Sequence, residues 1–167
     1  MPIKRIWTTE LEDAFDVEQL ASRVLDNAME ALESDDFVQA AVFFVTSKEL
    51  HCYSVSFTGY DEKEATYQDV VRTAQEINAR ALVTLNDAYT GDPKTFDPAT
   101  YEWGQLAANH KGECVFVSVS GPGLENWSKE VQYRRENGRI VFSEPEIERM
   151  SFLGLLQNWA KKGQRVK

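Results

Sequence analysis

Apolar residues recur at the spacing of an amphipathic helix in two parts of the chain. The first predicted helix begins after Asp16, which is a good N-cap residue, and ends at residues 34–36. The second begins near Asp61 and ends at residues 78–80. Its apolar face comprises Tyr67, Val70, Val71, Ala74 and Ile77. The apolar stripe of the first comprises Val17, Leu20, Ala21, Val24, Leu25, Ala28 and Leu32. Both patterns predict helices that pack against a core on one side only.

Between and after these helices, short apolar or alternating segments predict β-strands. One segment alternates clearly, with Tyr53, Val55 and Phe57 on one face of the strand. Asn137-Gly138 is a strong signal for a tight hairpin between two later strands. The predicted strands are residues 37–45, 50–57, 81–85, 114–120, 127–136 and 139–143.

The remaining segments have weaker patterns. Residues 2–13 predict a loosely held arm, anchored by Ile6 and Trp7. Residues 90–112 predict a long loop insertion, and a loop of this length in a compact domain is often functional. A last helix is predicted from Pro145 or Ser151 to Lys162.

The order of elements is helix, hairpin, helix, strand, long loop, three-strand meander and helix. This order predicts a single α+β domain over residues 1–167, with a mostly antiparallel sheet of about six strands and helices packed on it. The hairpin, the second helix, the strand at 79–83, the Asp97-Pro98 loop and the Asn137-Gly138 hairpin resemble a loose family of small uncharacterised bacterial α/β proteins. The resemblance covers most of the chain after Asp36 and implies no activity.

Composition narrows the possible functions. Hydrophobic residues make up 43% of the chain and charged residues 27%, as in ordinary folded domains. A formal net charge of -9 argues against nucleic-acid binding, because a polyanion would be repelled. No apolar run reaches membrane-spanning length, and two cysteines cannot form a disulfide framework. We therefore expect a cytoplasmic protein that binds neither nucleic acid nor membrane.

The sequence lacks the residues that common catalytic and metal sites need. Its only histidines are His51 and His110, so the ligand patterns of cytidine-deaminase-like and JAB-type zinc enzymes are missing. A zinc site joining these histidines with Cys52 and Cys114 is disfavoured, because adjacent strand residues point to opposite faces. Gly-x-Ser-x-Gly and phosphate-loop motifs are also missing. We predict no catalytic residues, no metal and no cofactor.

Two hypotheses for function remain. The first is a non-catalytic protein-interaction or self-associating domain that forms a homodimer, with a flat sheet face of small residues as its interface. That face is predicted to comprise Cys52, Ser54, Ser56, Phe116 and Ser118.

The alternative is a small-ligand-binding protein or hydrolase-type enzyme with its site under the 90–112 loop. Polar residues gather where the strand ending at Leu85 opens into this loop, and strand ends next to long loops commonly form sites. The candidate ligand-binding residues are Asn86, Asp87, Thr90, Asp92 and His110.

Overall fold

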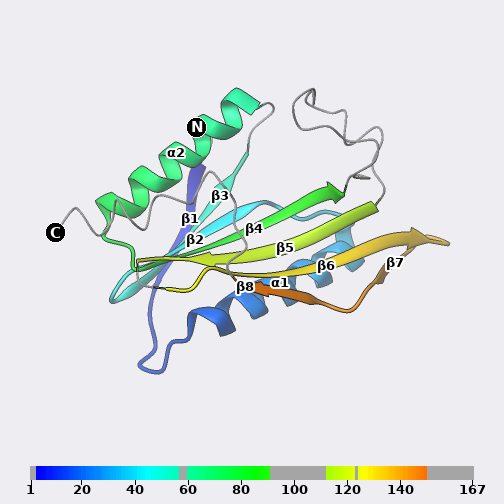
Figure 1. The fold of residues 1–167 in the computed structure, drawn as a ribbon, viewed down its shortest axis with the longest axis horizontal. Helices are drawn as coiled ribbons and strands as arrows, with labels where there is room; N and C mark the ends of the chain where they lie inside the picture. The colour runs from blue at the N-terminus through cyan, green and yellow to red at the C-terminus, as the bar shows by residue number, and fades with distance from the viewer. Residues whose placement is uncertain (1–2, 57–59, 91–111, 123, 150–167) are drawn as a thin grey trace.

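The computed structural model describes residues 3–56, 60–90, 112–122 and 124–149, which form an antiparallel sheet with two helices (Figure 1). The helices are α1 (Val17–Asp35) and α2 (Tyr60–Glu76). The strands are β1 (Ile3–Glu10), β2 (Ala41–Val45), β3 (Glu49–Val55), β4 (Ala81–Thr90), β5 (Gly112–Ser120), β6 (Trp127–Glu136), β7 (Arg139–Phe142) and β8 (Glu146–Arg149).

The strands follow the order β1-β3-β2-β4-β5-β6-β7 across an 8-stranded sheet. Every neighbouring pair is antiparallel. β7 and β8 both pair with β6, β7 with residues 133–136 and β8 with residues 127–130. Within the described part of the chain, β1 pairs with β3 alone and forms one edge of the sheet.

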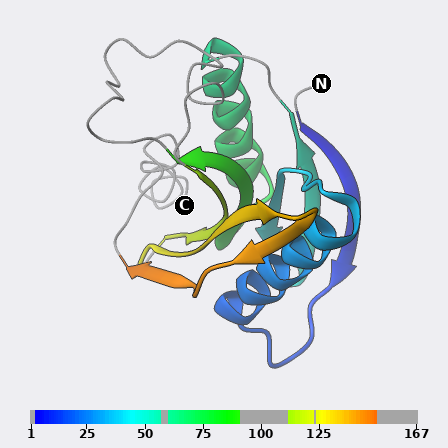
Figure 2. The ribbon, with the colours of Figure 1, turned by 90° about the vertical axis from the view of Figure 1, so that its right-hand side faces the viewer.

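The two helices cover opposite faces of the sheet, which we call the α1 face and the α2 face (Figure 2). On the α1 face, Phe43, Val83 and Val117 pack with the apolar stripe of α1. On the α2 face, Val42, Phe44 and Leu82 pack with α2. The domain is therefore a three-layer arrangement with two separate apolar cores.

None of the helices described here is long and apolar enough to cross a membrane.

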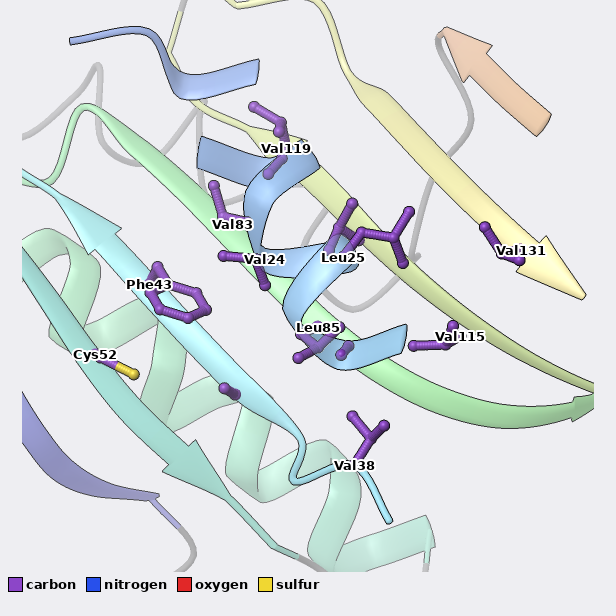
Figure 3. Packing of buried hydrophobic residues seen from close by; sticks show 14 of the residues in the cluster. Val24, Leu25, Val38, Phe43, Cys52, Val83, Leu85, Val115, Val119 and Val131 are labelled. Carbon is purple, nitrogen blue, oxygen red and sulfur yellow. The ribbon is translucent and has the colours of Figure 1, made fainter. Parts of the chain in front are cut away.

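The larger core lies under α1, where apolar side chains from six strands meet the helix (Figure 3). Val24 and Leu25 of α1 are 7% and 1% exposed. Val115 and Val131, from β5 and β6, are both at 0%. The central strand β2 is buried at all five positions, because one of its sides faces each helix.

The residues predicted to cap or turn the chain do so at the ends of α1 and between β6 and β7. The Asp16 side chain caps α1 by accepting hydrogen bonds from the backbone N–H groups of Glu18 and Gln19, at 2.9 and 3.3 Å. Asp36 ends α1 in the left-handed conformation, with φ 53°, and its N–H donates to the carbonyl of Leu32. Asn137 and Gly138 both have positive φ, as the predicted tight turn between β6 and β7 requires.

The single α+β domain with a mostly antiparallel sheet is confirmed, but the sheet has two more strands than the six predicted. The arm predicted over residues 2–13 is wrong, because residues 3–10 form β1. The helix predicted from Pro145 is also wrong, because Glu146–Arg149 is strand β8. A start at Ser151 lies outside the described residues. The second helix begins at Tyr60, so Asp61 lies in its first turn and does not precede it.

The α2-side core gives a direct test of the layer assignment. Phe44 is fully buried there, and its ring meets that of Tyr53 edge-on, with centroids 5.1 Å apart. We expect Phe44→Ala to lower the free energy of unfolding by about 3–5 kcal/mol, through lost burial and a residual cavity. Urea denaturation measures this loss. Phe37→Ala is the matched control, since Phe37 is 61% exposed and its removal should change stability little. Equal losses in the two variants would contradict the burial of Phe44.

Candidate functional site

The structure separates the two best-placed residues of the predicted ligand site. Asn86 and Asp87 are consecutive on β4, so their side chains point to opposite faces of the sheet. Asn86 accepts a hydrogen bond from the Tyr67 hydroxyl of α2 at 3.1 Å. Asp87 accepts one from the Tyr133 hydroxyl of β6 at 2.7 Å. Asp92, His110 and the side chain of Thr90 lie outside the described residues.

Asp87 belongs to a polar cluster on the α1 face, which we call the Arg135 network. Its members come from the end of α1 and from β4, β5 and β6, and they are Asp36, Asp87, Glu113, Tyr133 and Arg135. The guanidinium of Arg135 donates to Asp36 through Nη2 at 2.6 Å and through Nε at 3.2 Å. Its Nη1 donates to Glu113, and its centre lies 5.7 Å from the centroid of the Tyr133 ring.

The sequence of α1 explains why this network forms at its C-terminal end. Glu33, Asp35 and Asp36 place negative charge where the helix dipole is already negative, and the last turn contains no basic residue. Arg135 of β6 brings the missing cation to this position. The network therefore connects the end of α1 to the sheet, and the charge of Arg135 reduces the repulsion among the carboxylates.

The pKa shifts in the network have identifiable causes. Burial raises the pKa of the Asp87 carboxyl above its ordinary value of 3.8, while the hydrogen bond from Tyr133 acts in the opposite direction. Burial and the hydrogen bond to Asp87 raise the pKa of the Tyr133 hydroxyl, so it remains a donor at neutral pH. The bond to Asp36 raises the pKa of Arg135, which stays charged.

These contacts limit what the network can do chemically. All three guanidinium nitrogens of Arg135 donate to carboxylates within it, and Tyr133 donates to Asp87. The charge of Arg135 is therefore paired with the carboxylates of Asp36 and Glu113, which makes its guanidinium a poor anion-binding group.

The interface predicted on one sheet face is wrong as drawn, because its residues lie on both faces. Cys52 is buried in the α1-side core, as Figure 3 shows beside Phe43, and Ser54 shares its side of β3. Ser118 lies on the α2 face, where its hydroxyl meets that of Thr84. Phe116 alternates with buried Val115 and Val117 and so shares the face of Ser118. Ser56 follows the end of β3 and is exposed.

Both cysteines are buried free thiols on opposite faces of the sheet. Burial raises the pKa of the Cys52 thiol to about 11 and also raises that of Cys114. Neither is therefore activated as a nucleophile at neutral pH. Across the ranges that the structure describes, no three His, Cys, Asp or Glu side chains are grouped closely enough to hold a metal ion.

A hollow of about 530 Å³ lies between the N-terminal half of α1 and strands β6 and β8. Trp127 and Ile147 line it from the sheet, and Asp16, Arg23 and Asp26 line it from the helix. Asp16 is engaged in capping α1. The lining mixes acidic, basic and apolar side chains, so this hollow does not specify a ligand.

The most distinctive surface is one that the sequence patterns missed, the outer edge of β1. Seven of its eight residues are exposed, among them Ile6 at 54% and Trp7 at 42%. Trp7 contacts the core only at its margin, with its ring centroid 6.1 Å from that of Phe43. The available signal was the run Ile6-Trp7-Thr8-Thr9, in which every residue type favours strands.

A bulge in β1 explains why the alternating pattern of a strand is not seen in its sequence. Arg5 is opposite Tyr53 of β3 and Trp7 is opposite Cys52, so Ile6 has no partner on β3. An extra residue in a strand interrupts its alternation between the two faces. A sequence pattern of period two is consequently lost at the position where β1 is most apolar.

Comparison with known proteins returns no matching family model, no similar curated protein and no matching solved structure. The resemblance to small bacterial α/β proteins thus remains a prediction. The geometry of the described residues is what bears on function.

Asp87 gives a pH-dependent test of the Arg135 network. Because its pKa is raised in the folded state, its contribution to stability is present below the ordinary value of 3.8 and is lost as pH rises through the folded pKa. We expect Asp87→Asn to be more stable than the parent at pH 7, and the difference to vanish below about pH 3.8. Urea denaturation at pH 7 and pH 3 measures this. A parent that gains stability over the variant as pH rises would contradict the assignment.

The thiols give a second test. We expect native protein at pH 8 to react only slowly with the thiol reagent DTNB, because both cysteines are 4% exposed and the pKa of Cys52 is about 11. In denaturant, both should react at once. Fast modification of one thiol in the native protein would show that its strand opens readily or that its burial is wrong.

Proposed function

We propose that the protein is a non-catalytic domain that self-associates through the outer edge of β1. The observation that supports this most is the exposure of Ile6 and Trp7 on that edge. An edge strand presents a row of unpaired backbone N–H and C=O groups, which is a template for another strand. Strand addition supplies main-chain hydrogen bonds, and the exposed apolar side chains add buried area.

The chemistry of the described residues favours association over catalysis. The charge of Arg135 is paired with carboxylates, both thiols have raised pKa values, and Asn86 and Asp87 project from opposite faces of β4. The alternative of a small-ligand or hydrolase site loses its convergent geometry at these positions. Two buried free cysteines also suit a reducing, cytoplasmic compartment.

Light scattering over a dilution series tests the proposal. We expect the parent at high concentration to approach twice the chain mass of 19.0 kDa. We expect Ile6→Lys to stay near one chain mass, because a lysine there adds charge to the edge and removes exposed apolar surface. Ile147→Lys is the matched control, since Ile147 is 55% exposed and lies on β8, at the opposite side of the sheet.

The outcomes separate two failures. If the parent remains at one chain mass at every concentration, self-association is refuted. If Ile147→Lys abolishes association while Ile6→Lys leaves it intact, the protein associates through the β8 side and the assignment to β1 is wrong.

A further inference from the structure

The bulge at Ile6 fixes which side chains of β1 lie on each face of the sheet. Before the bulge, Arg5 is opposite Tyr53, on the α2 face, and Lys4 is on the α1 face. After it, Trp7 is opposite Cys52, on the α1 face, and the alternation resumes from there. The α2 face of β1 therefore comprises Ile3, Arg5, Thr8 and Glu10, and the α1 face comprises Lys4, Trp7 and Thr9.

We propose that the partner of this edge is β1 of a second copy, paired antiparallel about a two-fold axis that passes between Ile6 and Trp7. This inference rests on the proposed function, since it names the partner and register of the same edge. Each residue of the strand then finds an opposite residue in the partner strand. The opposite pairs are Ile3 with Glu10, Lys4 with Thr9, Arg5 with Thr8, and Ile6 with Trp7.

The bulge selects this register. Directly opposite residues of an antiparallel pair lie on the same face, and in this register Lys4 and Thr9 share the α1 face while Arg5 and Thr8 share the α2 face. With Trp7 opposite Trp7, Lys4 would be opposite Glu10, although these two lie on different faces. Moving by one more position would set Trp7 opposite Thr8, which also lie on different faces. One full-length register therefore matches the faces.

The charges favour the same register. Arg5 and Glu10 of the partner strand are diagonal neighbours on the α2 face, within reach of a long side chain. Within its own sheet, Glu10 is directly opposite Glu49, which places two like charges side by side. A guanidinium from the second copy would relieve this repulsion twice, because the two-fold axis repeats the pair.

The same charges disfavour other partners. Basic residues on an edge strand disfavour pairing with arbitrary strands, because such a strand supplies no negative charge to neutralise them. Lys4 and Arg5 are both exposed at this edge. A second copy supplies the carboxylate of Glu10 at the correct end of the strand. It also places Trp7 of each chain beside Ile6 of the other.

Among the residues that the structure describes, only β3 pairs with β1, so the other side of the strand is open to a partner strand. β1 lies at the outer margin of the sheet in Figure 2, with the two helices on either face and not across its edge. A two-fold axis perpendicular to the sheet keeps each face on its own side. The two sheets would therefore become one continuous sheet, with both copies of α1 on one side and both copies of α2 on the other.

A charge-swap series tests the register by sedimentation equilibrium. Arg5→Glu should raise the dimer dissociation constant about tenfold, since two attractive pairs become two repulsive ones. The double variant Arg5→Glu/Glu10→Arg should return it to within about threefold of the parent value. Lys4→Glu is the matched control, because it makes the same charge change on the same strand at a position where Thr9 is opposite and no carboxylate of the partner strand is a diagonal neighbour. It should change the constant by less than about threefold.

Disulfide trapping tests the register independently of charge. Lys4→Cys/Thr9→Cys should give a covalent dimer on oxidation, because directly opposite residues lie within disulfide reach. Within one chain, positions 4 and 9 are about 16 Å apart along the strand, so they cannot join to each other. Lys4→Cys/Thr8→Cys, one position out of register, should remain unlinked.

These experiments distinguish the register from the function on which it rests. A dimer that is lost in Ile6→Lys but shows no rescue by the charge swap and no 4–9 cross-link would refute this pairing while leaving β1 as the interaction edge. A parent that stays monomeric would refute both. Rescue by the double variant together with the 4–9 cross-link is the result we expect.

Discussion

Enclosure of the central strands between two helices is the constraint on which the rest of this structure depends. β2 is buried at all five positions, so polarity alone cannot define which of its side chains face α1 and which face α2. Side-chain size and the neighbouring strands set the register. On the α2 face, for example, the hydroxyls of Thr84 and Ser118 pair across β4 and β5, where an unpaired hydroxyl would be costly.

The parts of the fold that could be predicted from sequence are those in which burial imposes a period. The stripes of α1 and α2 and the apolar inner strands are such parts, and Val55, Val70 and Leu82 are buried as expected. β1 was missed because its bulge breaks the alternation and because an edge strand needs no apolar face. In β8, the four residues Glu146–Arg149 are too few to distinguish a strand from the first turn of a helix.

The predicted site residues that the structure describes lie on different faces for a related physical reason. Asn86 and Asp87 were expected to emerge together from a loop, but β4 continues to Thr90 through its pairing with β5, so alternation sends them to opposite faces. The predicted interface combined residues of β3 and β5, which are separated by β2 and β4. Whether a residue of β3 and a residue of β5 share a face depends on the pairing registers of three successive strand pairs. These registers cannot be determined from the pattern of each strand taken alone.

The distance along the chain between α1 and its partners affects how the protein must fold. Arg135 meets Asp36 across 99 residues, and the core beneath α1 includes buried residues of β5 and β6. During synthesis, α1 emerges long before β5 and β6. Its apolar stripe therefore remains partly exposed until these strands have been made. Such non-local closure slows folding and prolongs the time in which an incomplete chain can aggregate. The earlier strands β2, β3 and β4 cover only part of the helix, so its cover is complete only after β5 and β6 have been synthesised.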